Sequence, residues 1–334
     1  MTIASVNLRN SLATPWPGVG LCAAFTVFVV AAATLAAVLP LQAAIGIVFL
    51  FAGPHNLLEA RFMLGRLPAR AGRLRPFFAT AVGGTVVLAA AFAALPWAAR
   101  AGLDGGFLHA IWNAALCVWV AALVVLRSRT NPRFDAGWVP AAAMLVAVAQ
   151  GPWPWVFGLG LVFLHPLMAL AVLHRELRRS RQEWLPAWRC ALATVPLGVV
   201  VIWAATSAGG NLVPRSEVEA TVIRQAGVDI LGLASARSVV AIHAFLELVH
   251  YGVWIVVLPA VGLGTSLWRI DTVPLARRGR AWARIVAAAL AGGGLAVAAL
   301  WACFCVDYTT TRHVYFTVAV LHVLAEIPFL IRMP

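Results

Sequence analysis

Three stretches of this sequence each place a histidine and a glutamate on one face of an apolar helix. The pairs are His55 with Glu59, Glu247 with His250, and His322 with Glu326. Residues spaced i,i+3 or i,i+4 lie one above the other on a helix. Imidazole and carboxylate are the ligands that non-haem iron, zinc and manganese prefer in proteins. The spacing therefore predicts a metal site whose ligands come from several helices.

Two further features support this interpretation. Glu247-Leu-Val-His250 has the Glu-x-x-His spacing by which helical bundles hold di-iron centres. Another apolar stretch carries His165. Each carboxylate either binds the ion or accepts a hydrogen bond from a histidine ligand, and the spacing leaves both roles open. The expected ligands are His55, His165, Glu247, His250, His322 and Glu326, with Glu59, His109, His243 and Tyr251 forming a second layer around them.

The elements that position these residues are membrane helices. The chain has 334 residues, of which 62% are hydrophobic and 11% charged, and its mean hydropathy is +0.90. A segment of about 20 apolar residues crosses a hydrocarbon core of about 30 Å. Ten apolar stretches are visible, at 18–40, 41–62, 77–97, 105–126, 137–152, 154–174, 190–207, 237–263, 283–303 and 313–331. We therefore expect an all-α polytopic transmembrane bundle that forms a single domain over residues 1–334.

The distribution of arginine predicts how the bundle is oriented. The net charge is +13, from 25 basic and 12 acidic residues. Arginines gather after the second, fourth, sixth and eighth stretches, for example at Arg66, Arg127, Arg178 and Arg277. Under the positive-inside rule, this alternation places both termini in the cytoplasm. Because the arginines have this topological role, nucleic acid is not an expected partner.

Two further expectations concern location and the longest outer connection. The composition, rich in arginine and alanine, favours a bacterial inner membrane. The connection at about 208–236 contains an amphipathic segment near 216–231. This segment is either an interfacial helix on the membrane surface or part of an ordinary connecting loop.

In this topology the helices that carry the expected ligands all run inward, so their depths can be compared. His55, His250 and Glu326 lie about 13–14 residues from the outer ends, and the other expected ligands about 10–11. At 1.5 Å per residue, these positions form one slab about 6 Å thick near mid-membrane. Ionisable groups at that depth are costly unless paired, and they mark functional sites. His109 and His243 are shallower, which places them in the second layer.

Two motifs, "GPHNLLEA" and "FLHPLMALAVLHREL", are similar to motifs of the membrane-embedded bacterial β-carotene-cleaving dioxygenases of the Brp/Blh type. The resemblance implies an all-helical fold that holds iron with histidines from several spans. It also implies cleavage of a carotenoid with O₂, with His55 and His165 among the metal ligands.

Several functions fit these features. The first is a non-haem metal oxygenase or oxidoreductase, with one or two iron ions, that acts with O₂ on a lipophilic substrate from the surrounding lipids. The second is electron transfer through haem bound by axial histidines. The third is a proton or metal-ion transporter that uses the same side chains as a relay. Zinc is an alternative to iron as the bound metal.

Overall fold

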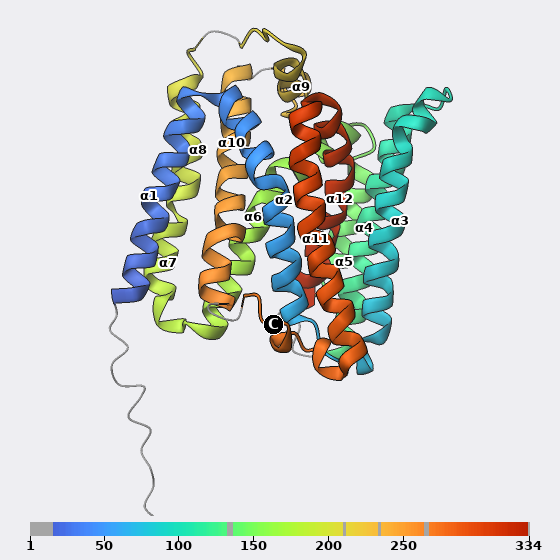
Figure 1. Cartoon of the computed structure of the whole chain (residues 1–334). Coiled ribbons are helices and arrows are strands. Elements are labelled where there is room, and N and C mark those ends of the chain that lie inside the picture. The colour runs from blue at the N-terminus through green and yellow to red at the C-terminus, as the bar shows by residue number, and fades with distance from the viewer. Residues whose placement is uncertain (1–15, 132–135, 210–211, 233–234, 264–266, 333–334) are drawn as a thin grey trace, which may run out of the picture.

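The computed structural model describes residues 16–131, 136–209, 212–232, 235–263 and 267–332. Within these ranges every regular element is helical (Figure 1), so the all-α prediction is confirmed. The long helices are α1 (Trp16–Val38), α2 (Pro40–Arg66), α3 (Arg75–Arg100), α4 (Gly105–Thr130), α6 (Pro154–Ser180), α10 (Ala236–Gly252), α11 (Arg280–Val306) and α12 (Tyr308–Arg332). A ninth apolar segment combines α7 (Leu185–Leu192) with α8 (Thr194–Thr206).

In the described part of the chain, nine helices are long and apolar enough to cross a membrane, one fewer than expected. The stretch at 137–152 forms only α5 (Val139–Ala149), whose 11 residues span about 17 Å, too little for a hydrocarbon core. Gln150, at the end of α5, accepts a hydrogen bond from Asn113 and donates one to the carbonyl of Ala110 on α4. Asn113 also donates to the carbonyl of Pro154. The chain thus returns to the end of the bundle where α4 begins, and α6 starts there too.

Five helices, α2, α4, α6, α10 and α12, run in the same direction through the bundle (Figure 1). Arginine side chains join their final turns. Arg332 donates to the carbonyl of Arg66, and Arg127 donates to the carbonyl of Arg332. Arg66 donates to Glu176 on α6 and to the carbonyl of Gly262, which follows α10. We call this the lower end of the bundle and the opposite one the upper end.

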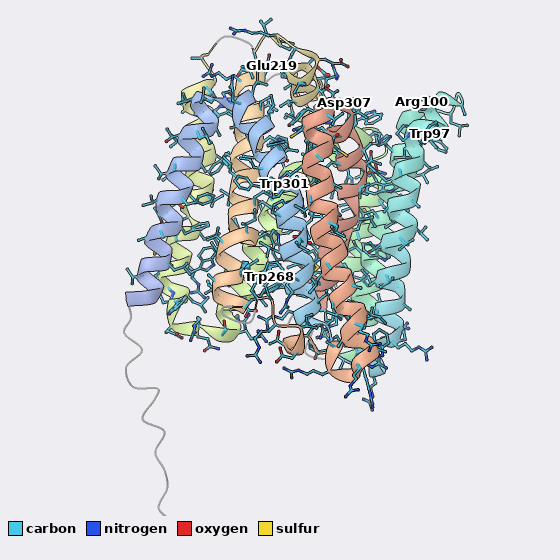
Figure 2. All side chains as sticks on the ribbon, in the orientation of Figure 1. Trp97, Arg100, Glu219, Trp268, Trp301 and Asp307 are labelled. Carbon is cyan, nitrogen blue, oxygen red and sulfur yellow. The ribbon has the colours of Figure 1, made fainter. Side chains whose placement is uncertain are left out.

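The two ends differ in what they carry. Glu219 and Asp307 lie at the upper end and Trp268 at the lower end (Figure 2). The upper connection forms α9 (Glu217–Gln225), a helix shorter than the segment expected near 216–231. Positions 210–211 and 233–234 of that connection lie outside the described residues. The arginine-rich connections follow helices that end at the lower end, and cytoplasmic termini stay a prediction from that charge pattern.

The helix α10 lies inside the bundle, whereas α11 lies at its edge. In the segment that contains α10, 72% of the residues in an 18-residue apolar stretch are buried. In the corresponding stretch of α11, only 6% are buried. The helix α10 packs against α1, α2, α6 and α8. Among the nine segments, the one with the Glu247 and His250 motif is therefore the one most enclosed by protein.

Irregular helix geometry occurs beside the predicted site. Pro54, Pro166 and Pro328 lie inside α2, α6 and α12, and each removes one backbone hydrogen bond. After Gly252, the helix α10 continues as the π-helical segments η4 (Val253–Val257) and η5 (Pro259–Leu263). Single π-helical turns inside α-helices are frequent at functional sites because they re-aim side chains.

Candidate metal centre

Four histidines from α2, α6, α10 and α12 meet inside the bundle. The ring centroid of His165 lies 4.5 Å from that of His250 and 5.0 Å from that of His322. The ring centroid of His55 lies 5.4 Å from that of His250 and 5.2 Å from that of His322. His55 and His250 are buried, and the other two are partly buried. The structure thus brings together the four histidines that the depth comparison placed in one slab.

Two of these rings are held by backbone carbonyl groups. Nδ1 of His55 lies 2.9 Å from the carbonyl oxygen of Phe51, and Nδ1 of His250 lies 3.3 Å from that of Pro166. A carbonyl oxygen only accepts, so each Nδ1 carries the proton and each Nε2 a lone pair. Both Nε2 atoms are buried, and no described residue forms a hydrogen bond with them. A neutral imidazole oriented in this way is the usual form of a metal ligand.

The other two histidines face each other. Nε2 of His165 lies 3.1 Å from Nε2 of His322, and Nδ1 of His165 lies 3.1 Å from Oε2 of Glu326. The carboxylate favours a proton on Nδ1 of His165, which leaves the lone pair on Nε2. Two nitrogens bound to one ion at about 2.1 Å are roughly 3.0–3.4 Å apart. The separation of these two rings therefore suits a shared metal ion.

The carboxylate of Glu59 lies near three of the four histidines. One ligand atom from each of His55, Glu59, His250 and His322 lies within 4.8 Å of the other three. The side chain of Glu59 is buried, and its Oε2 has no hydrogen-bond partner among the described residues. Glu59 was expected in the second layer, but the structure groups it with three of the expected ligands. This His/Glu group could hold a metal ion.

Glu326 lies beside the histidines and is itself oriented by a second side chain. Its Oε1 accepts a hydrogen bond of 3.1 Å from Nε1 of Trp254 on η4. Its other oxygen is the one beside His165. Trp254 was not expected in this role, although it follows His250 by four residues and so shares its helix face. The sequence gives no sign of the π-helical turn in which Trp254 lies.

Glu247 lies in a different environment from Glu59. Its Oε1 is 3.6 Å from Nε2 of His243, one turn nearer the upper end of α10. It is not among the four residues of the His/Glu group. An i,i+3 pair is offset by about 60° around the helix axis, so the neighbour of His250 need not reach the same point. Glu247 and His243 therefore form a separate buried pair above the four histidines.

The remaining second-layer residues lie in two places. The ring of Tyr251 is buried and lies 4.2 Å from that of His55, next to the site. His109 stacks on Trp155 with ring centroids 4.0 Å apart, and its Nδ1 lies 2.8 Å from the carbonyl oxygen of Gly105. The ring contact attaches the start of α4 to α6, and the contact with Gly105 lies within α4. His109 therefore has a local structural role at the upper end.

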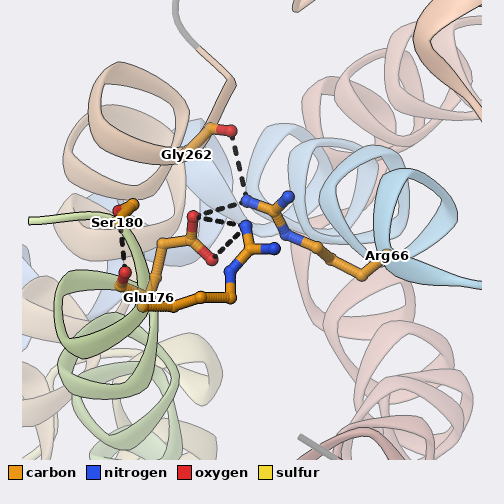
Figure 3. Close-up of polar contacts among 5 residues, drawn as sticks. Arg66, Glu176, Ser180 and Gly262 are labelled. Carbon is orange, nitrogen blue, oxygen red and sulfur yellow. Dashed lines mark hydrogen bonds and ion pairs between the residues drawn. The ribbon is translucent and has the colours of Figure 1, made fainter.

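An ion-pair network fixes the site helices at the lower end. Glu176 on α6 is buried and accepts a hydrogen bond of 2.6 Å from Arg66 on α2 and one of 3.0 Å from Arg179 (Figure 3). Arg66 also donates to the carbonyl of Gly262, 3.2 Å away (Figure 3). The network connects α2, α6 and the segment after α10. It therefore constrains three of the four helices that supply histidines.

Comparison of the chain with protein-family models, with curated proteins and with solved structures found no match. The resemblance to carotenoid-cleaving dioxygenases therefore rests on its two sequence motifs alone.

Proposed function

We propose that this chain is a membrane-embedded non-haem metal oxidoreductase that holds iron with the four histidines and uses O₂ to oxidise a lipophilic substrate. The observation that carries the proposal is the convergence of the rings of His55, His165, His250 and His322. The buried Nε2 atoms of His55 and His250 have no hydrogen-bond partner among the described residues. Unpaired polar atoms inside a membrane protein are costly. A bound cation compensates for that cost.

The donor set decides which metals fit. The site offers imidazole nitrogens and the carboxylates of Glu59 and Glu326, which suit iron, zinc and manganese. None of the five cysteines belongs to the His/Glu group, which disfavours metals that prefer thiolate. Iron supplies O₂ activation when bound, and the resemblance to iron dioxygenases favours it over zinc.

The protein groups around the site have separate tasks. The carbonyls of Phe51 and Pro166 fix the rings of His55 and His250, which keeps their lone pairs directed into the site. Trp254 orients Glu326, which holds the proton on Nδ1 of His165. The surrounding apolar helices exclude water and so protect reactive species from side reactions.

The packing of the rings disfavours haem. Five of the six pairs among the four histidine rings have centroids no more than 6.5 Å apart. Bis-histidine haem needs two imidazoles on opposite faces of a porphyrin. A porphyrin is wider than the spaces between these four rings, so haem would require the helices to move apart.

A second candidate function, proton or ion conduction, is favoured by buried polar groups above the site. Glu247 and His243 are both buried. Nearer the upper end, the buried Arg312 donates to Gln225 of α9 and to the hydroxyl of Tyr308. Chains of buried ionisable groups mark proton pathways in membrane proteins. In this interpretation, the four histidines would be part of a relay.

The two functions differ in what the iron-loaded protein does to lipids. The test is incubation of the protein in nanodiscs with neutral lipid fractions and ¹⁸O₂, followed by mass spectrometry. Label in a lipid product that is lost in His55→Ala and kept in His313→Ala would support the oxygenase, because His313 is exposed. Absence of labelled product from protein that retains iron would contradict it. Voltage-driven proton uptake by liposomes containing the protein would then support conduction.

A further inference from the structure

Basic side chains gather where α6 is followed by α7 at the lower end of the bundle (Figure 1). Arg178 lies in the last turn of α6, and Arg189 lies one turn after the start of α7. The two helices pack against each other. His174 lies one turn before Arg178 on the same face of α6, and the positive charges of Arg178 and Arg189 both act on its ring. The two arginines therefore lie near one partly buried imidazole.

Neither arginine is neutralised by the protein. Among the described residues, none forms an ion pair or a hydrogen bond with the guanidinium group of Arg178 or Arg189. The carboxylate of Glu176 is buried and is paired with two other arginines (Figure 3). Glu183, in the turn between the helices, is exposed and forms no ion pair with either of them. Because like charges repel, an anion from outside the chain would stabilise this arrangement.

The position of the two arginines along their helices indicates what that anion is. Arg189 belongs to Gln182–Thr206, a segment long and apolar enough to cross a membrane, and it lies about two turns from the lower end of that segment. The side chains of both Arg178 and Arg189 are exposed. An exposed arginine near the end of a membrane helix extends its charged group to the headgroup region. The two guanidinium groups therefore reach the level at which phospholipids carry their phosphate groups.

Above the basic side chains, α8 presents an exposed apolar surface. The helix begins at Thr194, five residues after Arg189. Leu197, Val200 and Val201 are 60%, 62% and 54% exposed. An acyl chain attached to a phosphate at Arg189 would extend along these side chains into the hydrocarbon core. The surface therefore offers positive charge at headgroup level and apolar contacts next to it, which a lipid uses together and a free phosphate ion does not.

We propose that Arg178 and Arg189 bind the headgroup of an anionic phospholipid whose acyl chains lie along α8. Guanidinium groups suit phosphate because each can donate two parallel hydrogen bonds to it. Clusters of basic side chains between helices at a membrane surface are typical sites for anionic headgroups. The positive charge repels the ammonium group of a zwitterionic headgroup, so the site favours a lipid with a net negative charge. The lipid site does not depend on the proposed metal centre.

The test is native mass spectrometry of the full chain in detergent, titrated with phosphatidylglycerol or with phosphatidylcholine that has the same acyl chains. We expect one bound phosphatidylglycerol, with a Kd about tenfold or more below that of phosphatidylcholine. The double variant Arg178→Gln, Arg189→Gln should weaken phosphatidylglycerol binding at least about tenfold, because each arginine at an anionic surface contributes about fivefold. The matched control, Arg70→Gln, Arg73→Gln, removes the same charge from exposed positions between α2 and α3 and should change the affinity by no more than about twofold.

A second measurement needs no variant. Phosphatidylglycerol with a diazirine in one acyl chain, cross-linked to the wild-type protein by light, should label segment 194–206. Equal weakening of binding in the two double variants would overturn the proposal, because the affinity would then come from the overall charge of the lower end. Equal affinities for the two lipids, or cross-links only outside 194–206, would also overturn it. Displacement of the lipid by inorganic phosphate or by a poly-glutamate peptide would show instead that the arginines bind a free anion or an acidic protein.

Discussion

Nε2 of His165 and Nε2 of His322 lie 3.1 Å apart, although the two residues belong to helices far apart in the sequence. With Glu326 beside Nδ1 of His165, the lone pair of that ring points at its partner. Either His322 donates a proton to it, or both lone pairs face one cation. The second arrangement also accounts for the unpaired nitrogens of His55 and His250.

The two central glutamates should differ in their effect on metal binding. Glu59 lies in the His/Glu group, and Glu247 pairs with His243 above it. Glu59→Gln keeps the shape but removes the charge, so we expect metal affinity to fall about 10–100-fold. Glu247→Gln should change the metal affinity by no more than about twofold relative to the wild-type protein. Metal titration monitored by elemental analysis after desalting distinguishes them, and a larger loss in Glu247→Gln would restore Glu247 as a ligand.

Trp254 should act on the metal through Glu326. Trp254→Phe removes the Nε1 donor 3.1 Å from Oε1 of Glu326 but keeps an aromatic ring. Loss of a hydrogen bond that orients a group beside a ligand typically lowers metal affinity about 10–100-fold. Trp112→Phe is the matched control, because its indole donates to the carbonyl of Leu88 on α3. Equal metal affinities in the two variants would show that Trp254 does not position Glu326.

The network around Glu176 should stabilise the fold rather than bind metal. Glu176→Gln leaves Arg66 without its buried carboxylate partner, and we expect a loss of about 3 kcal/mol in stability. Thermal unfolding in detergent, followed by tryptophan fluorescence, measures it.

The matched control for that network is Asp271→Asn. The hydrogen bond from Arg269 lowers the pKa of the Asp271 carboxyl, but both side chains are exposed. Exposed ion pairs contribute little, so unfolding should be unchanged. If both variants unfold alike, the lower-end network does not constrain the site helices.

Metal binding should stabilise the folded protein. A ligand that binds only the native state adds about 2.7 kcal/mol at 100 times its Kd. Ferrous iron added to metal-free protein should therefore raise the unfolding temperature, and removal by a chelator should reverse the rise. His165→Ala should abolish the effect. A rise that persists in His165→Ala would place the bound iron elsewhere.

The histidine cluster could be predicted from the sequence because it depends on two regular quantities, helix periodicity and depth. His55, His165, His250 and His322 occur on helices that run in one direction, so similar distances from the helix starts bring them to one level. The rotation of each helix about its axis decides which neighbouring carboxylate faces the cluster. That rotation depends on packing, and it explains why Glu59 lies in the His/Glu group and Glu247 above it.

Two other features depend on non-local packing. The second span was expected to end at residue 62, but α2 continues to Arg66. Arg66 is accommodated there because Glu176 from α6 reaches it. The stretch at 137–152 is apolar up to Gln150, yet only α5 forms there, between a proline at its first turn and the turn that begins at Gln150.

The central claim is that the four histidines hold a non-haem iron ion. The most direct test is elemental analysis with a visible spectrum on purified protein, beside the His250→Ala, His322→Ala double variant. We predict stoichiometric iron without a Soret band in the wild-type protein and loss of iron in the variant. A Soret band, or no bound metal in the wild-type protein, would contradict the account.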